Sequence, residues 1–358
     1  MPPRTIRCPD CDNRFILDSH DAAEGRVVCR QCGATIPIRD VVRPRDGSRS
    51  KSGGKSSIAV WLVAGIVLFV LFVVLCCGGL IYVVYTAMQP HEFPEQLKDY
   101  AEARKTFKTK LVQSGPSPQA QGPVLIPQGA TAIAYDSGSL KLKAWINKPA
   151  AGDKPKPAVL YLHGGFAFGE DDWDQCQPFR DAGFVTMTPI LRGENGQPGN
   201  FSLFYDEVDD AIAAAELLAK TPGVDPNRLF VAGHSAGGTL ALLTAMTSKR
   251  FKGCASFSGS PDQVTFLRDE PDLVKFDQTD PNEYAMRSPL AFPKSFKCPV
   301  RLYWGDDEPP QLFLFSSQKL AEKATANGQD VQAISVPGDH DTAVAPAMKL
   351  AIAFFQQK

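Results

Sequence analysis

The sequence predicts a mostly parallel, doubly wound α/β sheet over residues 124–358, preceded by a small cysteine-rich module and one membrane-spanning helix. Three observations support this prediction. Short apolar runs alternate with amphipathic segments over the last two thirds of the chain, which is typical of successive βαβ units. A glycine-framed serine, Gly233-His-Ser-Ala-Gly237, lies between an apolar run and a run of small residues. Two Cys-x₂-Cys pairs precede an uncharged stretch at residues 58–88.

Residues 1–38 are predicted to form a zinc ribbon with short strands at Arg14–Leu17 and Arg26–Val28. The two Cys-x₂-Cys pairs are separated by 17 residues, a spacing that brings four thiolates around one tetrahedral zinc ion. So short a segment cannot bury an adequate core, and bound zinc would supply its folding free energy. Disulfides are the competing interpretation. The predicted zinc ligands are Cys8, Cys11, Cys29 and Cys32.

This module resembles the zinc ribbons at the N-termini of some bacterial membrane proteins, through the pattern Cys-Pro-x-Cys followed by Cys-x-x-Cys-Gly. A protein partner for such a ribbon is expected, although the sequence does not indicate its identity. Nucleic acid is not expected as a partner, because the 38 Lys and Arg residues are balanced by 39 Asp and Glu residues.

Residues 58–88 are predicted to form a transmembrane helix, so the lipid bilayer is an expected partner. They include no charged residue over 31 positions, and about 20 apolar residues already span a bilayer. The preceding residues 39–57 are predicted to be a flexible basic linker. Six basic residues lie in this linker, whereas the first one after the predicted span is Lys98. The positive-inside rule therefore places the N-terminus in the cytoplasm and the large domain outside the cytoplasmic membrane.

The elements after the predicted span follow from local composition and periodicity. Residues 89–123 are expected to hold a short juxtamembrane helix, at about 91–111, and then a linker rich in Pro and Ser. A hairpin, buried strands and helices of period 3.6 are expected from residue 124 onward. In chain order they are the hairpin Thr131–Tyr135 with Leu140–Ile146, strands Ala158–Leu162 and Gly183–Thr188, helix Val208–Lys220, the turn Asp225–Arg228, strand Leu229–Ala232, helix Thr239–Met246, strands Gly253–Phe257 and Val300–Trp304, helix Leu314–Asn327, strand Val331–Val336 and helix Ala345–Gln356.

Ser235 is the predicted nucleophile. A Gly-x-Ser-x-Gly pentad at a strand-to-helix junction is the context of a nucleophile elbow, in which Gly233 and Gly237 leave room for the crossing backbone. The serine Oγ would lie at the N-terminus of a helix, whose dipole favours developing negative charge. A glycine-rich turn with an idle serine is the alternative interpretation.

The C-terminal region resembles the α/β-hydrolases, and within that superfamily it is most similar to the prolyl oligopeptidase and dienelactone hydrolase-like group. The resemblance implies a serine hydrolase that works through an acyl-enzyme and a triad in the chain order Ser, Asp or Glu, His. The segments that carry the resemblance lie in the expected order and are His163-Gly-Gly-Phe166, residues 191–196, 224–229 and 233–238, Ser288-Pro289, and Cys298-Pro-Val300 with Trp304-Gly305.

The same resemblance implies the base and the oxyanion hole. His340 follows the last predicted strand, which is the family's base position. The oxyanion hole would be formed by the backbone N–H of Ala236 together with that of Gly165 or Phe166.

The acid of the triad is left open among three carboxylates. Similar hydrolases usually carry aspartate three residues after the glycine that ends the preceding strand, and that position is Glu308 here. Glutamate is the acid in some α/β-hydrolases, so Glu308 is the first candidate. Asp306 is the reserve candidate, and Asp307 could also reach the histidine.

The expected activity is that of a membrane-anchored serine hydrolase acting on a small carboxylic ester, or on short peptides and amides, with no cofactor for catalysis. Prolyl oligopeptidases usually carry a propeller domain that filters peptides. Residues 89–123 cannot encode one, so esters are expected first. Residues 259–297 are long for a crossover and are expected to form a small lid. The alternative is a catalytically idle hydrolase fold that senses a ligand and is coupled to the zinc ribbon.

Overall fold

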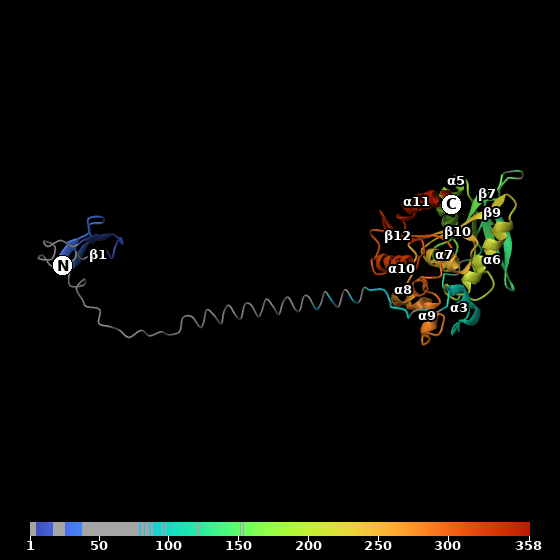
Figure 1. The fold of residues 1–358 in the computed structure, drawn as a ribbon, viewed down its shortest axis with the longest axis horizontal. Helices are drawn as coiled ribbons and strands as arrows, with labels where there is room; N and C mark the ends of the chain where they lie inside the picture. The colour runs from blue at the N-terminus through green and yellow to red at the C-terminus, as the bar shows by residue number, and fades with distance from the viewer. Residues whose placement is uncertain are drawn as a thin grey trace. The chain divides into compact units, whose positions relative to one another are not determined.

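The computed structural model divides into two compact units, Met1–Gly78 and Gly79–Lys358 (Figure 1). No helix within the described ranges is both long enough and apolar enough to cross a membrane. The predicted transmembrane segment 58–88 lies outside the described residues except for three positions, and the linker 39–57 lies outside them entirely. The structure describes residues 5–16, 26–37, 79, 82, 86, 89–94, 96, 98–119, 122–150, 152 and 154–358.

The N-terminal unit contains two antiparallel hairpins, and each hairpin turns on one Cys-x₂-Cys pair. Both strands predicted in this unit are present, and each pairs with a short strand that was not predicted. The hairpins are β1 (Thr5–Arg7) with β2 (Arg14–Ile16), and β3 (Arg26–Val28) with β4 (Thr35–Pro37). The described side chains buried in this unit are Cys8, Val27, Cys29 and Ile36.

The larger unit is built on an eight-stranded sheet in the order β12-β11-β10-β9-β7-β8-β6-β5. The six strands from β12 to β8 are parallel, and β6 runs antiparallel to both β8 and β5. The predicted mostly parallel, doubly wound sheet is thus confirmed. The strands are β5 (Thr131–Ser137), β6 (Leu140–Ile146), β7 (Lys156–Leu162), β8 (Val185–Pro189), β9 (Val224–His234), β10 (Phe251–Phe257), β11 (Val300–Gly305) and β12 (Val331–Val336).

Helices cover both faces of this sheet (Figure 1). Two buried apolar clusters form, and the neighbouring residues Phe230 and Val231 of β9 belong to different ones, because side chains alternate between the faces of a strand. Phe230 stacks on Phe355 of the last helix at a ring-centroid distance of 4.4 Å. The helices of these layers are α4 (Glu170–Gln175), α5 (Gln177–Asp181), α6 (Glu207–Lys220), α7 (Ala236–Thr247), α10 (Leu314–Ala326) and α11 (Val344–Gln356).

Two local predictions are corrected by the structure. Residues Asp225–Arg228 belong to β9 instead of forming a separate turn, since β9 begins at Val224 and pairs with β7 across a register shift. The helix expected at about 91–111 is limited to α3 (Tyr100–Thr106), which Asp99 caps by accepting a hydrogen bond from the backbone of the first turn.

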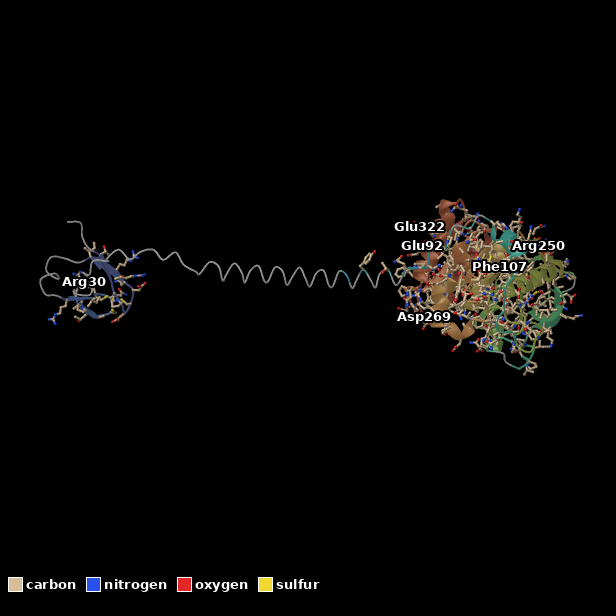
Figure 2. All side chains as sticks on the ribbon, turned by 90° about the horizontal axis from the view of Figure 1, so that it is seen from below. Arg30, Glu92, Phe107, Arg250, Asp269 and Glu322 are labelled. Atoms are coloured by element: carbon tan, nitrogen blue, oxygen red, sulfur yellow. The ribbon has the colours of Figure 1, made fainter. Side chains whose placement is uncertain are left out.

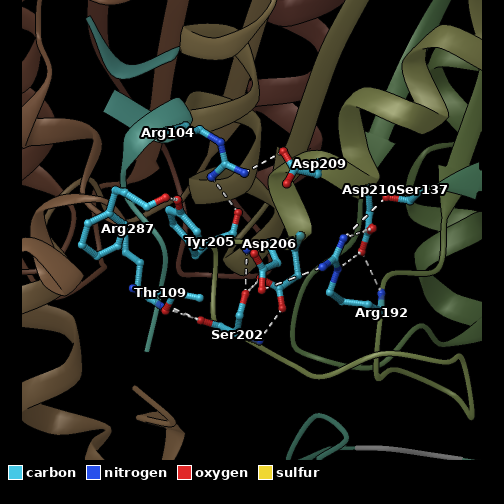
Figure 3. Close-up of polar contacts among 12 residues, drawn as sticks. Arg104, Thr109, Ser137, Arg192, Ser202, Tyr205, Asp206, Asp209, Asp210 and Arg287 are labelled. Atoms are coloured by element: carbon cyan, nitrogen blue, oxygen red, sulfur yellow. Dashed lines mark hydrogen bonds and ion pairs between the residues drawn. The ribbon is translucent and has the colours of Figure 1, made fainter. Parts of the chain in front are cut away.

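The segment that contains α3 and precedes the sheet packs on the rest of the larger unit and is not a free linker. The side chain of Tyr100 is fully buried, and Arg104 forms an ion pair of 2.7 Å with Asp209 of α6 (Figure 3). These contacts join residues that are about a hundred positions apart in the chain. The larger unit therefore includes residues before Val124, where the sequence analysis placed the start of the domain.

Residues 259–297 form a helical insertion between β10 and β11. Its anchor is Arg287, a fully buried guanidinium that donates to the carboxylate of Glu283 (2.6 Å), the hydroxyl of Thr109 (2.8 Å) and the carbonyl oxygen of Ser202 (2.8 Å) (Figure 3). The insertion is thereby attached to the segment before the sheet. Its elements are α8 (Gln263–Asp269, with Asp269 labelled in Figure 2), η2 (Pro271–Leu273), α9 (Pro281–Ala285) and η3 (Pro289–Ala291).

Candidate active site

The predicted site lies at the carboxyl ends of β7 and β9. These strands are neighbours in the sheet, although β8 lies between them in the chain. The chain leaves β7 toward one side of the sheet and returns to form β9 on the other side, and ligands of open α/β sheets bind at such a switch point. The residues after β7 carry the predicted oxyanion loop, and Ser235 follows β9 directly.

Ser235 occupies a strained turn between β9 and α7. Its backbone angles, φ 54° and ψ −119°, lie outside the regions that residues other than glycine usually adopt. A Cβ added at Gly233 would collide with the carbonyl group of Gly237, and one added at Gly237 would collide with that of Leu162. The N–H of Ser235 donates to the carbonyl oxygen of Phe257 (2.8 Å). The pentad thus forms a tight elbow with Ser235 at the N-terminus of α7.

Ser235, His340 and Glu308 form one continuous chain of hydrogen bonds. His340 Nε2 lies 2.9 Å from Ser235 Oγ, and His340 Nδ1 lies 2.5 Å from Glu308 Oε1. Because a carboxylate only accepts, Nδ1 carries the proton and the lone pair of Nε2 faces the serine. The side chain of Glu308 is 1% exposed and that of His340 is 39% exposed, so the acid is buried while the base is accessible to solvent.

Two further hydrogen bonds fix the position of Glu308. Its Oε2 accepts from the N–H of Gly305 (2.6 Å) and from the hydroxyl of Ser258 (2.7 Å). Ser258 follows β10 and has φ 50°. It was not predicted as a site residue, and only its place directly after a predicted strand could have indicated it.

The other two carboxylates of this loop have different surroundings. Asp306 Oδ1 accepts from the N–H of Gly338 (2.9 Å), in the loop that leads to His340. Asp307 is exposed to solvent. The structure therefore brings Glu308, and not the reserve candidate Asp306, to the histidine, because Asp306 already caps the backbone of the neighbouring loop.

His234 supports the loop that carries the base. Its Nε2 lies 2.9 Å from the carbonyl oxygen of His340, and its Nδ1 lies 3.4 Å from the side-chain nitrogen of Gln175. A neutral ring fits both contacts, with Nε2 donating and Nδ1 accepting. Burial is the main cause that lowers the pKa of His234, and the neighbouring His340 lowers it further. No role was predicted for this residue, and its contacts make it a support for His340.

The predicted oxyanion donors come from two elements. Gly165, in the loop after β7, has φ 63°, a conformation that favours glycine. Phe166 N–H donates to the side-chain oxygen of Gln119 (2.8 Å), and both residues line the pocket that contains Ser235. Ala236, the other predicted donor, is the first residue of α7 and lines the same pocket. Gln119 was not predicted, because its Pro- and Ser-rich surroundings are typical of a linker.

His163 anchors the oxyanion loop through a buried pair with Glu194. Its Nε2 lies 2.9 Å from Glu194 Oε2, and its Nδ1 lies 2.9 Å from the carbonyl oxygen of Gly164. Burial lowers the pKa of His163, but the charge and the hydrogen bond of Glu194 raise it, and the resulting pKa is about 9. His163 is therefore an imidazolium at neutral pH, and both of its N–H groups donate.

A pocket of about 390 Å³ contains Ser235 and His340, a volume within the range of small-molecule sites. Residues of the 259–297 insertion, among them Gln263 and Glu270, form one wall, so the predicted lid segment borders the site. The apolar lining consists of Phe166, Phe204, Phe266, Leu273, Pro309 and Phe313.

The N-terminal unit brings the four predicted zinc ligands together. The sulfur atoms of Cys8, Cys11, Cys29 and Cys32 lie within 4.8 Å of one another, and all four cysteines are free. Cys8 and Cys32 are 3.5 Å apart at sulfur, and Cys11 and Cys29 are 3.6 Å apart. Zn–S bonds of about 2.3 Å in a tetrahedron require sulfur atoms about 3.8 Å apart, so the cluster fits zinc.

Comparison with known proteins relates the larger unit to a family of peptidases. The model of the prolyl oligopeptidase family, Peptidase S9, matches residues 172–353. The uncharacterized peptidase YtmA of Bacillus subtilis (strain 168) is 28% identical over 186 residues, which cover 49% of this chain and 72% of that protein.

Solved structures share the fold of the larger unit. An acylaminoacyl peptidase in complex with Z-Gly-Gly-Phe-chloromethyl ketone has a TM-score of 0.54 at 21% identity, over 64% of this chain and 41% of that chain. The thermophilic, butyrate-bound esterase Est2 of Thermogutta terrifontis has a TM-score of 0.52 at 20% identity, over 64% of this chain and 94% of that chain. The match thus spans less than half of the peptidase but nearly all of the esterase.

Proposed function

The chain belongs to the prolyl oligopeptidase family of serine hydrolases, and we propose that it hydrolyses carboxylic esters through an acyl-enzyme on Ser235. The observation that carries this proposal is the chain of hydrogen bonds from Glu308 through His340 to Ser235. A buried carboxylate in this position orients the imidazole and stabilises the imidazolium that forms when the serine proton is transferred.

The proposed reaction begins when Ser235 Oγ attacks the acyl carbonyl carbon and its proton passes to Nε2 of His340. The carbonyl oxygen becomes an oxyanion, which the N–H of Ala236 and that of Gly165 or Phe166 would bind. The imidazolium then protonates the departing alkoxide, so an alcohol leaves and the acyl group stays on Ser235. Water gives a proton to His340 and attacks the acyl-enzyme, and release of the carboxylic acid restores the serine.

We propose short-chain esters as the first substrates and short peptides or amides as the second choice. The mostly apolar pocket of about 390 Å³ is at the small end of the range of small-molecule sites. The matched esterase carries butyrate in its solved structure, and its chain is covered almost completely. The acylaminoacyl peptidase is covered over 41% of its chain, which gives weaker support for peptides.

Hydrolysis of p-nitrophenyl butyrate by the full-length chain tests this reaction. The chain should release p-nitrophenolate, and mass spectrometry after rapid quenching should detect a butyryl group on Ser235. The variant Ser235→Ala should lose both signals, whereas Ser139→Ala, which changes an exposed hairpin serine, should keep them. Faster cleavage of an aminoacyl p-nitroanilide would contradict the ester preference. No turnover of either compound would contradict the proposed hydrolase and favour a binding protein.

For the N-terminal unit we propose a structural zinc ion held by the four cysteines, with no part in hydrolysis. The sequence also supports a single membrane anchor at residues 58–88, with this unit in the cytoplasm and the hydrolase unit outside. Protease added to sealed, inverted membrane vesicles should degrade the N-terminal unit and spare the hydrolase unit. Degradation of the hydrolase unit alone would reverse the orientation.

A further inference from the structure

A short strap, residues 115–119, lies against the oxyanion loop. The N–H of Ser117 donates to the carbonyl oxygen of Gly193 (3.0 Å), and the N–H of Phe201 donates to that of Gly115 (2.9 Å). The buried hydroxyl of Ser117 donates to the carbonyl oxygen of Phe166. The strap is thus docked by its own backbone and by one side chain, directly beside a predicted oxyanion donor.

The last residue of the strap places a carbonyl group on that donor. Gln119 Oε1 accepts the hydrogen bond of Phe166 N–H at 2.8 Å, and Gln119 lines the pocket that contains Ser235 and His340. A Cβ at Gly165 would lie 2.9 Å from this oxygen, so the absence of a side chain there permits the close approach. The carboxamide oxygen of Gln119 is chemically the same kind of acceptor as the carbonyl oxygen of an ester or amide substrate.

We propose that Phe166 N–H is the oxyanion donor of this loop and that Gln119 is an internal competitor of the substrate, whose carboxamide oxygen occupies this N–H until a substrate displaces it. This inference rests on the proposed hydrolase function. The N–H group has one proton, so it serves the glutamine oxygen or the substrate oxygen but not both at full strength. Ser235 therefore reacts productively only in molecules whose Gln119 side chain has left the hole.

The size of the effect follows from the strength of one neutral hydrogen bond. Such a bond favours the state in which Gln119 occupies Phe166 N–H by a factor of about five. The apparent affinity for substrate is the intrinsic affinity multiplied by the fraction of molecules in which this N–H is free. Once the substrate is bound, the glutamine is displaced and the chemical step is unaffected. The competitor thus raises KM for every ester by the same factor and leaves kcat unchanged. A purely structural role for Gln119 would instead loosen the oxyanion loop on removal and lower kcat.

Steady-state kinetics of the full-length chain with p-nitrophenyl acetate tests the inference. Gln119→Ala should lower KM about fivefold at constant kcat and should raise the second-order rate of fluorophosphonate labelling by the same factor. Gln119→Glu should do the opposite, because a carboxylate binds an N–H donor more strongly than a carboxamide does. Gln113→Ala is the matched control, since the Gln113 side chain accepts from Lys275 at the exposed surface. It should behave as the wild type.

The outcomes separate this inference from the function on which it rests. The internal competitor is supported if KM rises in the order Gln119→Ala, wild type, Gln119→Glu while kcat stays constant. A loss of kcat in Gln119→Ala, or equal rates in all variants, would overturn it while leaving the hydrolase intact. Absence of turnover and labelling in every variant would overturn the hydrolase proposal, and the competitor with it.

Discussion

At the scale of single residues, Glu308 divides its two oxygens between separate tasks. Oε1 faces His340, and Oε2 is held by the N–H of Gly305 and the hydroxyl of Ser258. Three donors around one buried carboxylate fix its position and prevent it from turning away from the imidazole. A glutamate can therefore do at this position what an aspartate does in similar hydrolases.

Replacement of Glu308 by Gln should lower kcat by about 10⁴ for p-nitrophenyl butyrate. The neutral amide does not stabilise the imidazolium, and its NH₂ group can reverse the tautomer of His340. Asp306→Asn is the matched control, because the new amide oxygen still accepts from Gly338. A kcat for Glu308→Gln within tenfold of the wild type would show that His340 works without this acid.

The buried pair of His163 and Glu194 should make stability depend on alkaline pH. The pKa of His163 is about 9 in the folded chain and about 6.5 when unfolded. A raised pKa means that the contribution is fully present below pH of about 6.5 and is lost as pH rises through about 9. The charged neighbours that face His163 are Glu194 and Asp172. Denaturant unfolding at pH 6 to 10 should therefore show a steeper loss of stability for the wild type than for His163→Gln. Parallel profiles would refute a charged His163.

The role of a single residue could be predicted where it depends on the sequence pattern around that residue. It could not be predicted where it depends on contacts with residues that are distant in the chain. Ser235 is marked by its flanking glycines, and His340 by its place after the last strand. Glu308 could be ranked first by counting from the strand, but its choice over Asp306 needs the contact with Gly338. The position of Gln119 depends on distant backbone partners of the strap, and no pattern within residues 114–123 encodes them.

At the scale of elements, the 259–297 insertion contains a buried ion pair. Glu283 and Arg287 are 0–1% exposed at their side chains, and Glu283 also accepts from Lys110 N–H and the Thr109 hydroxyl. Glu283→Ala should lower the free energy of unfolding by about 3–5 kcal/mol, because it leaves a buried guanidinium unpaired. Glu322→Ala, at an exposed site of α10 (labelled in Figure 2), should change it by under about 0.5 kcal/mol.

Urea unfolding of both variants measures this difference. Equal stabilities would mean that the insertion is held mainly by its apolar contacts, and that the ion pair contributes little. The activity of Glu283→Ala is a second readout, since the insertion supplies one wall of the pocket.

The strands of the sheet could be predicted because each carries its apolar pattern within a few residues. The same holds for α6, α10 and α11, whose predicted bounds differ from the observed ones by no more than one residue at either end. The helix α3 is only seven residues long and is stabilised by the buried Tyr100 and by the ion pair of Arg104 with Asp209 of α6. Because these contacts form only in the folded unit, they could not be read from the local sequence pattern, which overestimated the length of the helix.

At the scale of the whole molecule, we expect the two compact units to draw on different sources of stability. The hydrolase unit has two extensive apolar clusters, whereas the buried cluster among the described residues of the N-terminal unit consists of four residues, two of which are cysteines. We expect one zinc ion per chain, and a strong chelator should unfold only the N-terminal unit.

Metal analysis of the purified full-length chain and of Cys29→Ser tests this expectation. The variant should lose the zinc ion and keep the wild-type kcat for p-nitrophenyl butyrate. Cys298→Ser, which changes a cysteine of the hydrolase unit, should keep the zinc. Zinc retained in Cys29→Ser would place the metal elsewhere.

The central claim is that Ser235, His340 and Glu308 act together as a catalytic triad. Covalent labelling of the full-length chain by a fluorophosphonate probe, with the modified residue located by mass spectrometry, tests it most directly. We predict labelling of Ser235 in the wild type, none in Ser235→Ala and at least a hundredfold slower labelling in His340→Ala. A folded wild-type chain that resists the probe, or labelling at the wild-type rate in His340→Ala, would contradict the triad.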